Sequence, residues 1–391
     1  MIKRYFIFFF LIRSIPLFAQ TSYYDFLPLG KHRVAFFDTI IYDQHKIYNQ
    51  YGYSGSSPLF VQVWFPNKKV ITKQYLRFSD LRNTKTPKEL DSVYKILNKH
   101  CDESILRDCI LYDIRNDNEL KYGNFSPEEV LTKIQNVETR ALRSESSSIT
   151  KYPVIVYHHG SRGLSDENYL MAEYFASQGY IFISANFHLP YRNSPFGLLP
   201  YELEKNYIHD QSAAKTVIDF AYQLSGKSDV FFIGHSWGAQ EGWCFLNEAG
   251  TVKAFISMET TIEFKSDSTE IKDKWPHVYE ALKINKKKIA IPVLLFAATE
   301  RAGKFDFFAS SGTNLMVHTS CKTAFAHNSY TALYMQRYFF KNEIPQADST
   351  ALYDQINGYV RHVKLIHHFL ESVRQHKKFK HKPFSGYFYF S

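Results

Sequence analysis

Short, almost wholly apolar segments recur through the second half of the chain, separated by longer stretches of mixed residues. They lie at residues 154–157, 180–185, 230–233, 254–258 and 293–297. Strands buried on both faces of a parallel sheet have this composition, whereas half-exposed strands alternate apolar and polar residues. The pattern predicts a central, mostly parallel sheet whose strands follow one another along the sequence.

The stretches between these strands carry apolar residues at helical spacing. A helix is expected to begin at Ser165, with Asp166 and Glu167 in its first turn, and to stop at Gly179. The next helix has an apolar stripe of Ala214, Val217, Ile218, Ala221 and Leu224. A C-terminal helix is marked by Ile356, Tyr359, Val360, Val363, Ile366 and Leu370. Strands and helices that alternate in this way indicate the α/β class, with helices flanking the sheet.

The first half of the chain departs from this alternation. Residues 34–42 and 59–65 are rich in β-branched and aromatic side chains, which predicts an antiparallel strand pair at the start of the sheet. Residues 66–150 are polar and charged, and we predict that they form a helical insertion between sheet strands. One of its helices starts near Pro87, and another starts at Ser126, where a capping box is present.

The N-terminus has the pattern of a secretory signal peptide. A short basic start is followed by the apolar residues 5–12, and Ala19 offers a small residue before the expected cleavage point. We predict that residues 1–19 are the signal peptide and that residues 20–391 form one large domain. The protein is therefore expected to be exported, to the periplasm or out of the cell, a choice that the sequence leaves open.

Charge and cysteine content narrow the classes of partner. Lys and Arg exceed Asp and Glu by 47 to 38, and removal of the signal peptide, with its three basic residues, leaves 44 minus 38, or six. Basic residues cluster at 286–288 and 374–382, which allows contact with an anionic membrane surface, but no nucleic-acid motif accompanies them. Cys101 and Cys109 are close enough in sequence for a disulfide, and no cysteine spacing fits a zinc site. We expect neither a metal nor another cofactor, and the oligomeric state is left open.

Residues 234–238, Gly-His-Ser-Trp-Gly, supply the first sign of chemistry. The pattern Gly-x-Ser-x-Gly places a serine on a sharp turn between a strand and a helix, where glycines are needed because the backbone is crowded. Here the apolar strand at 230–233 precedes Ser236, and residues 239–246 have helical character. Ser236 is therefore predicted to be a nucleophile.

A serine hydroxyl attacks a carbonyl carbon only when a base takes its proton, so a histidine is expected further along the chain. His327 is the first candidate because it lies between a predicted strand and a predicted helix, and His318 is the alternative. Glu259 and Glu300 each follow a predicted strand, so the sequence allows either carboxylate to orient the imidazole.

Backbone N–H groups must stabilise the negative charge that develops on the carbonyl oxygen during such an attack. One is expected from Trp237, the residue after the nucleophile. The other is expected from Ser161 in the loop His-His-Gly-Ser-Arg-Gly at 158–163. The aromatic loop at 187–201 follows a central strand and is predicted to line the substrate pocket.

These segments resemble the platelet-activating-factor acetylhydrolase branch of the α/β-hydrolase superfamily. The resemblance covers residues 58–67, with Val-Gln-Val-Trp-Phe-Pro, and the strand-bearing parts of residues 153–330, with the two motifs above and the His327 segment. It implies the α/β-hydrolase fold and supports both predicted oxyanion donors. It also favours Glu259 over Glu300 as the acid, although the family has Asp at that place.

Together, these residues predict an exported serine carboxylesterase, similar to acetylhydrolases that act in lipid degradation, with residues 20–391 as the catalytic domain. Ser236 would form an acyl-enzyme with a small-molecule ester, such as a short-chain acyl ester or a phospholipid, and water would release the acid. Two alternatives stay open. An acyltransferase would pass the acyl group to an alcohol or amine, and a non-catalytic binding protein would have kept only the scaffold.

Overall fold

The computed structural model describes residues 23–67, 74–106, 112–113, 118–119, 124–144, 149, 151–192, 211–226, 228–246, 251–260, 262–264, 268–285, 291–297, 315–320, 327–340, 349–379 and 387–390. The predicted signal peptide lies outside these residues. Within them, no helix is both long enough and apolar enough to span a bilayer.

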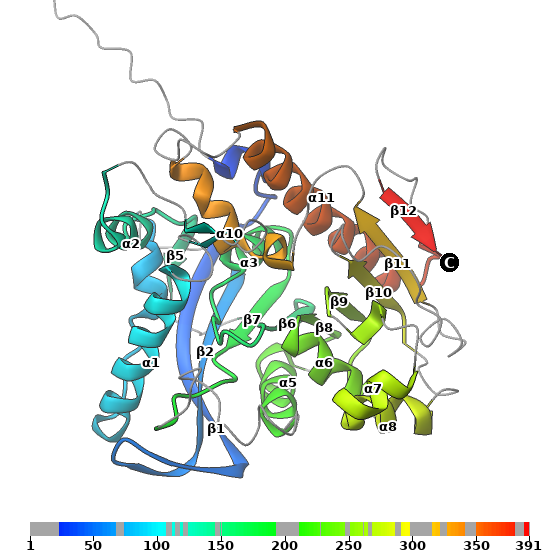
Figure 1. The fold of residues 1–391 in the computed structure, drawn as a ribbon, viewed down its shortest axis with the longest axis horizontal. Coiled ribbons are helices and arrows are strands. Elements are labelled where there is room, and N and C mark those ends of the chain that lie inside the picture. Colours follow the sequence, from blue (N-terminus) through cyan, green and yellow to red (C-terminus); the bar gives the residue numbers. More distant parts are fainter. Residues whose placement is uncertain are drawn as a thin grey trace, which may run out of the picture.

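Ten strands of the described residues form one sheet, in the order β12-β11-β10-β9-β8-β6-β7-β2-β1-β5 (Figure 1). The strands from β7 to β11 pair in parallel, whereas β2 and β12 pair antiparallel with their neighbours. All five apolar segments are strands, as predicted. The strands are β1 (Arg33–Gln50), β2 (Tyr53–Asn67), β5 (Ala141–Arg143), β6 (Val154–His158), β7 (Ile181–Ala185), β8 (Val230–His235), β9 (Phe255–Met258), β10 (Val293–Ala297), β11 (Leu315–Ser320) and β12 (Tyr387–Phe390), and a separate pair is β3 (Tyr112–Asp113) with β4 (Asn118–Glu119).

Helices cover both faces of the sheet, because neighbouring residues of each central strand point to opposite faces. Ile155 and Tyr157 of β6 enter the core that includes α3 and α11. Val154 and Val156 enter the core that includes α5, α6 and α8. The α-helices are α1 (Asp91–Ser104), α2 (Pro127–Gln135), α3 (Tyr169–Ser177), α5 (Ser212–Ser225), α6 (Trp237–Phe245), α7 (Ser268–Lys274), α8 (Pro276–Asn285), α10 (Ala332–Met335) and α11 (Ser349–Arg374). Short 3-10 helices are η1 (Tyr23–Phe26), η2 (Phe78–Arg82), η3 (Lys88–Leu90), η5 (Ile262–Phe264), η7 (His327–Tyr330) and η8 (Gln336–Phe340).

The order of strands changes direction at β6, which lies between β7 and β8. The chain runs from β6 through α3 to β7, and then returns through α5 on the other face to β8. The loops that leave the carboxyl ends of β6 and β8 therefore separate to opposite faces, and ligands bind at this position in open α/β sheets.

The segment predicted as a helical insertion, residues 66–150, contains α1 and α2, which lie beside the β1–β2 hairpin in Figure 1. The capping box of α2 is confirmed, since the Ser126 hydroxyl accepts a hydrogen bond from the Glu129 N–H and the Ser126 N–H donates to the Glu129 carboxylate. The segment is not wholly helical, because β5 pairs in parallel with the start of β1 and forms one edge of the sheet.

Two local expectations need correction. The helix expected from Ser165 begins at Tyr169, because Asp166 and Glu167 turn inward to bind Arg82 and Tyr157 instead of forming a first helical turn. It ends as predicted at Gly179, which has φ 97°.

The cysteine expectation also changes. Cys101 in α1 is a buried free thiol with its sulfur 4.0 Å from the carbonyl oxygen of Gly163, and it is not bridged to Cys109. Cys109 itself lies outside the described residues. Burial raises the pKa of Cys101 to about 12, so the thiol stays protonated at neutral pH.

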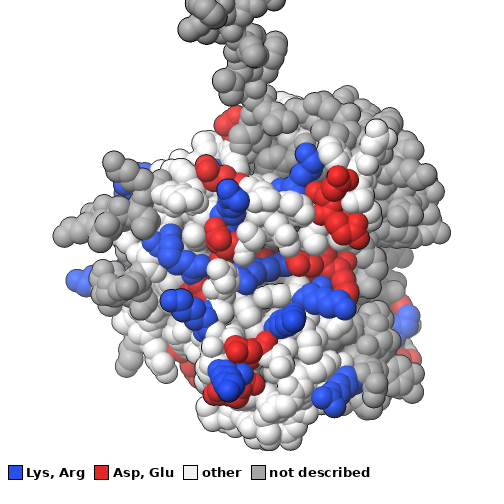
Figure 2. All heavy atoms as spheres, turned by 90° about the vertical axis from the view of Figure 1, so that its left-hand side faces the viewer, with Lys and Arg blue, Asp and Glu red and all other residues white. Residues whose placement is uncertain are grey.

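The face that carries α1 and α2 shows no gathering of one sign of charge. Basic and acidic side chains are interleaved across it (Figure 2). Of the two basic clusters predicted from the sequence, residues 286–288 lie outside the described residues. In the other, Arg374 forms an ion pair with Glu371 at 2.6 Å. Contact with a membrane surface therefore stays a prediction.

Candidate active site

Ser236 lies in the tight turn between β8 and α6. Its φ of 51° and ψ of −112° are a strained conformation for a residue with a side chain. A Cβ at Gly234 would collide with the backbone of Ala239, and a Cβ at Gly238 would collide with the carbonyl oxygen of His158. Both glycines are therefore required by the packing of the turn, which is the geometry of a nucleophile elbow.

His327 and Glu259 are brought together although 68 residues separate them. His327 begins η7, and its Nδ1 contacts Glu259 Oε2. Glu259 directly follows β9, is fully buried and has φ 50°. The His327 side chain keeps 35 % of its surface exposed, so it extends from the buried carboxylate towards the surface. Of the alternatives, His318 lies within β11, and Glu300 lies outside the described residues.

The surroundings of His327 favour its neutral form. Burial lowers the pKa of His327 well below its ordinary value, and the positive charges of His235 and Arg162 act in the same direction. A neutral imidazole is the form that can accept a proton. The carboxylate of Glu259 beside Nδ1 favours the tautomer in which Nε2 is the free acceptor.

Backbone contacts place this histidine–carboxylate pair beside the elbow. The ring of His235, the residue before Ser236, lies 4.9 Å from the ring of His327, and its Nε2 is 3.2 Å from the His327 carbonyl oxygen. The Ser236 N–H donates to the carbonyl of Met258, the residue before Glu259, at 3.1 Å. Ser236 therefore adjoins both members of the pair through immediate chain neighbours.

The loop after β6 faces the same turn and is held by hydrogen bonds on both sides of Gly160. A Cβ at Gly160 would lie only 3.3 Å from the Ser236 Cβ. The Gly160 N–H donates to Glu167 Oε1 at 3.3 Å, and its carbonyl oxygen accepts from His159 Nδ1 at 2.7 Å. Because the N–H and C=O of a trans peptide point in opposite directions, the bond from His159 turns the Ser161 N–H away from His159.

The protonation of His159 is set by its two partners. Its Nε2 accepts from the Phe187 N–H at 3.0 Å while Nδ1 donates, so the ring is neutral. Burial lowers the pKa of His159 to about 4, with His158 as a further cause, in agreement with these contacts. The loop therefore keeps one hydrogen-bonding pattern across the neutral pH range.

Part of the loop predicted to line the pocket packs inward instead. The Phe187 ring stacks on His158 with a centroid distance of 3.8 Å, and Leu189 is 4 % exposed. The Tyr48 hydroxyl donates to the carbonyl of Pro190, which ties this loop to the β1–β2 hairpin. Residues 193–201 lie outside the described residues. The described start of the loop is therefore core, not pocket wall.

Two buried histidine–carboxylate pairs under the elbow were not predicted from the sequence. His235 Nδ1 lies 3.1 Å from Glu167 Oε1, and His158 Nε2 lies 2.9 Å from Glu241 Oε2. Glu241 also accepts from the Trp237 indole N–H at 2.8 Å, which fixes the side chain that follows Ser236. The sequence signal was a polar side chain at a buried position of β6, β8 and α6, namely His158, His235 and Glu241. Among the described residues, no three His, Cys, Asp or Glu side chains form a group able to hold a metal ion.

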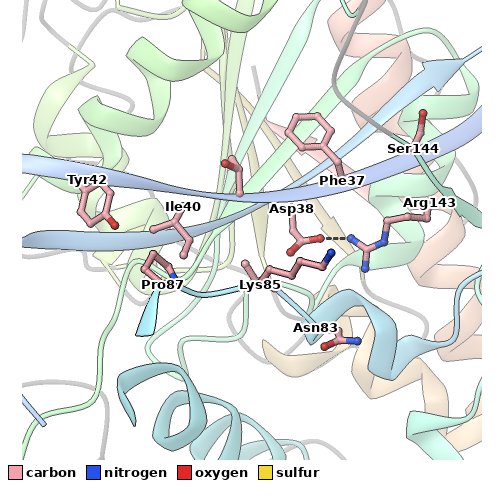
Figure 3. Close-up of a pocket in the computed structure, with 11 residues that line it drawn as sticks. Phe37, Asp38, Ile40, Tyr42, Asn83, Lys85, Pro87, Arg143 and Ser144 are labelled. Carbon is pink, nitrogen blue, oxygen red and sulfur yellow. Dashed lines mark hydrogen bonds and ion pairs between the residues drawn. The ribbon is translucent and has the colours of Figure 1, made fainter. Parts of the chain in front are cut away.

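A cleft of about 900 Å³ opens at the other end of the sheet, along β1 and the segment after η2 (Figure 3). Ile40, Tyr42 and Pro87 form its apolar wall, and Asp38 pairs with Arg143 beside Lys85. Three strands separate β1 from β8, so this cleft is distinct from the site at Ser236.

No protein-family model matches the chain, and a comparison with curated protein sequences found no match either. Among solved structures, a ferulic acid esterase from Streptomyces cinnamoneus is similar over 93 % of this chain and 98 % of its own, with a TM-score of 0.55 and 13 % identity. An acylaminoacyl peptidase from Pyrococcus horikoshii has a TM-score of 0.40 and 17 % identity over 61 % of this chain and 40 % of its own. Est1E from Butyrivibrio proteoclasticus has a TM-score of 0.32 and 17 % identity over 43 % and 78 %. The first likeness, together with the strand order, confirms that the chain has the α/β-hydrolase fold.

Proposed function

We propose that the protein is a serine hydrolase that cleaves carboxylic esters through an acyl-enzyme on Ser236. The observation that carries the proposal is the pair of His327 and Glu259, which adjoins a strained serine at the carboxyl edge of the sheet. A strained backbone and buried charged side chains lower the stability of a folded protein. Both features occur preferentially at functional sites.

In this mechanism the neutral His327 takes the proton of the Ser236 hydroxyl as its oxygen attacks the ester carbonyl. Glu259 holds the imidazole and stabilises the charge that it gains. The N–H groups of Trp237 and Ser161 stabilise the oxyanion, a role that the fixed peptide orientation at Gly160 supports. His327 gives this proton to the leaving alcohol as the ester C–O bond breaks and the acyl-enzyme forms, and water activated by the neutral His327 then releases the acid.

Labelling with a fluorophosphonate probe tests the nucleophile directly, because the probe reacts with an activated serine and not with an ordinary hydroxyl. Wild-type protein is expected to be labelled, and Ser236→Ala is expected to lower labelling and ester turnover by at least about 10⁴-fold. Ser54→Ala, in the exposed part of the β1–β2 hairpin, is the control. Equal labelling of wild type and Ser236→Ala would refute the assignment.

For the substrate we propose short- to medium-chain acyl esters, including phospholipids, on the basis of the resemblance to platelet-activating-factor acetylhydrolases. A panel of aryl esters from acetyl to palmitoyl, with a methyl ferulate arm suggested by the ferulic acid esterase likeness, should show the highest kcat/KM at about two to eight acyl carbons. Equal or faster turnover of long-chain triglycerides would contradict this choice. Turnover that rises with added alcohol or amine, with transfer product formed, would favour the acyltransferase.

We also propose export, supported by the N-terminal pattern of residues 1–19. Expression of the full chain with its own N-terminus should yield a mature protein that begins at Gln20, as measured by intact mass. Retention of Met1 on the cell-associated protein would argue against a cleaved signal peptide.

A further inference from the structure

His235 forms hydrogen bonds through both nitrogens of its ring. Nδ1 lies 3.1 Å from Glu167 Oε1, and Nε2 lies 3.2 Å from the carbonyl oxygen of His327. A carbonyl oxygen and a carboxylate both accept, so the ring of His235 is held between two acceptors, one in the loop after β6 and one at His327.

The carboxylate state of Glu167 is supported by its other partners. Oε1 also accepts from the Tyr157 hydroxyl at 2.5 Å and from the Gly160 N–H at 3.3 Å. Burial works to raise the pKa of Glu167, but the charge of His235 and these hydrogen bonds lower it below its ordinary value. Glu167 and His235 are therefore a buried ion pair, in which each charge depends on the other.

The same loop fixes the segment that follows His327. The Glu167 carbonyl oxygen accepts from the Leu333 N–H at 3.1 Å, and Asn168 Oδ1 accepts from the Ala332 N–H at 3.1 Å. His235 holds the other end of this segment, at the carbonyl of His327. The segment 327–333 is thus attached at both ends to one rigid unit made by the loop after β6 and the last residue of β8.

We propose that His235 is a positioning residue, which, bound to Glu167, holds the backbone of His327 so that the imidazole of His327 stays in reach of Ser236. The proposal rests on the proposed function, because His327 is positioned for a proton transfer. Loss of either bond of His235 would free the segment or the loop.

A second consequence is electrostatic. The charge of His235 disfavours a second charge on His327, which keeps His327 in the form that accepts a proton. Other groups around the pair contribute to the pH response of both rings. They are Glu167, Tyr157 and His159 on the side of β6, Arg162 in its loop, and Glu259 beyond His327.

The test compares wild type with His235→Gln and Glu167→Gln in fluorophosphonate labelling rate and in kcat/KM for an aryl acetate, from pH 5 to 10. Each variant is expected to lower both rates about 10- to 100-fold at neutral pH, the size of loss that a small misplacement of a catalytic group causes. The double variant should be no more than about twofold worse than the slower single variant, because the two residues act as a unit.

The pH profile separates positioning from simple packing. The acidic limb of the profile reports protonation of His327, and it should move to higher pH in His235→Gln, because removal of the neighbouring charge raises the pKa of His327. His367→Gln, which removes a half-buried histidine bound to Tyr174 on the far side of α3, should leave the profile unchanged.

The outcomes that overturn the proposal are distinct from failure of the proposed function. A uniform loss of rate in His235→Gln with the acidic limb unmoved, or a rate within twofold of wild type, rules out the positioning role. Absence of labelling in wild type would instead remove the serine nucleophile itself. Thermal unfolding of each variant checks that the fold is retained.

Discussion

The carboxyl end of β8 and the outer edge of β1 both gather charged side chains, but in different surroundings. Around Ser236, the carboxylates of Glu167, Glu241 and Glu259 are buried, and each has a histidine partner. At β1, Arg143 keeps 39 % of its side chain exposed beside its partner Asp38 (Figure 3). The first region also has two residues with positive φ, Ser236 and Glu259, whereas the lining of the β1 cleft has none.

The comparison teaches that a large cleft does not by itself mark chemistry in this molecule. The β1 cleft is large, but Arg143 beside the buried Asp38 keeps 39 % of its side chain exposed, so water weakens the attraction of this pair. The charges near Ser236 are desolvated, so each acts strongly on its neighbours. Substitutions near Ser236 should therefore have larger effects on activity and stability than substitutions at the β1 cleft.

Glu259→Gln should cause the largest loss. An amide at this place leaves the geometry nearly intact but cannot stabilise the imidazolium, and similar changes lower turnover by about 10²- to 10⁴-fold. The measurement is kcat/KM for an aryl acetate, with Glu270→Gln on the surface of α7 as the control. A rate within twofold of wild type would show that Glu259 is not the acid and would leave Glu300 as the candidate.

Glu263 should make folding stability depend on pH. Its carboxylate accepts from the Trp243 indole at 2.7 Å and from the Ser257 hydroxyl, and burial raises its pKa to about 7. The unfolded chain loses this proton near its ordinary value of 4.5, so the folded state binds more protons between these values. Stability should therefore fall as the pH rises from about 4.5 to 7, by about 3 kcal/mol, and Glu263→Gln should remove that decline.

Urea unfolding at pH 5 and pH 8 measures this linkage in wild type and variant. The difference in the free energy of unfolding between the two pH values should be smaller in Glu263→Gln. Identical pH dependence in both proteins would show that Glu263 is ionised in the folded state.

Gly238→Ala should destabilise the fold, because its Cβ would collide with the carbonyl oxygen of His158, which cannot move without disturbing β6. Overpacking of this kind costs about 1–3 kcal/mol. Gly55→Ala in β2 is the matched control, since its Cβ would meet only the end of the Tyr53 side chain. Chemical denaturation of both variants gives the comparison, and equal stabilities would mean that the elbow is less crowded than described.

Arg143→Ala should have the smallest effect. It removes the pair with Asp38 at the β1 cleft, and partly exposed pairs contribute about 0–1 kcal/mol. The labelling rate at Ser236 should stay within twofold of wild type. A larger fall in the labelling rate at unchanged stability would reveal coupling between the β1 cleft and the surroundings of Ser236.

Features set by local sequence were predictable. The sequence predicts the strands because their apolar composition reflects burial on both faces. It predicts the elbow because its glycines are required where the backbone is crowded. The pairing of His327 with Glu259 is in the structure as expected from their order along the chain. The roles of Ser161 and Trp237 as donors stay a prediction.

Features set by distant contacts were not predictable. The sequence predicts Glu167 in the first turn of a helix, because its partner His235 lies 68 positions away and local sequence does not reveal that contact. The β1–β2 hairpin extends beyond both predicted strands because Asp43 and Tyr48, polar residues in its outer part, bind Ser212 and Pro190 from other elements. The spacing of apolar residues indicates which face of a helix or strand is buried. It does not indicate which polar side chains form hydrogen bonds with distant residues.

The bond between Asn168 and the Ala332 N–H spans 164 residues, which has a consequence for biogenesis. At about 5–20 residues per second, a ribosome needs roughly 8–30 s to make the chain between these two positions. The nascent polypeptide therefore contains a complete elbow before its histidine exists. During synthesis the turn at Ser236 therefore exists before its contacts with the segment of His327, and long-range closure of this kind makes the final assembly slow.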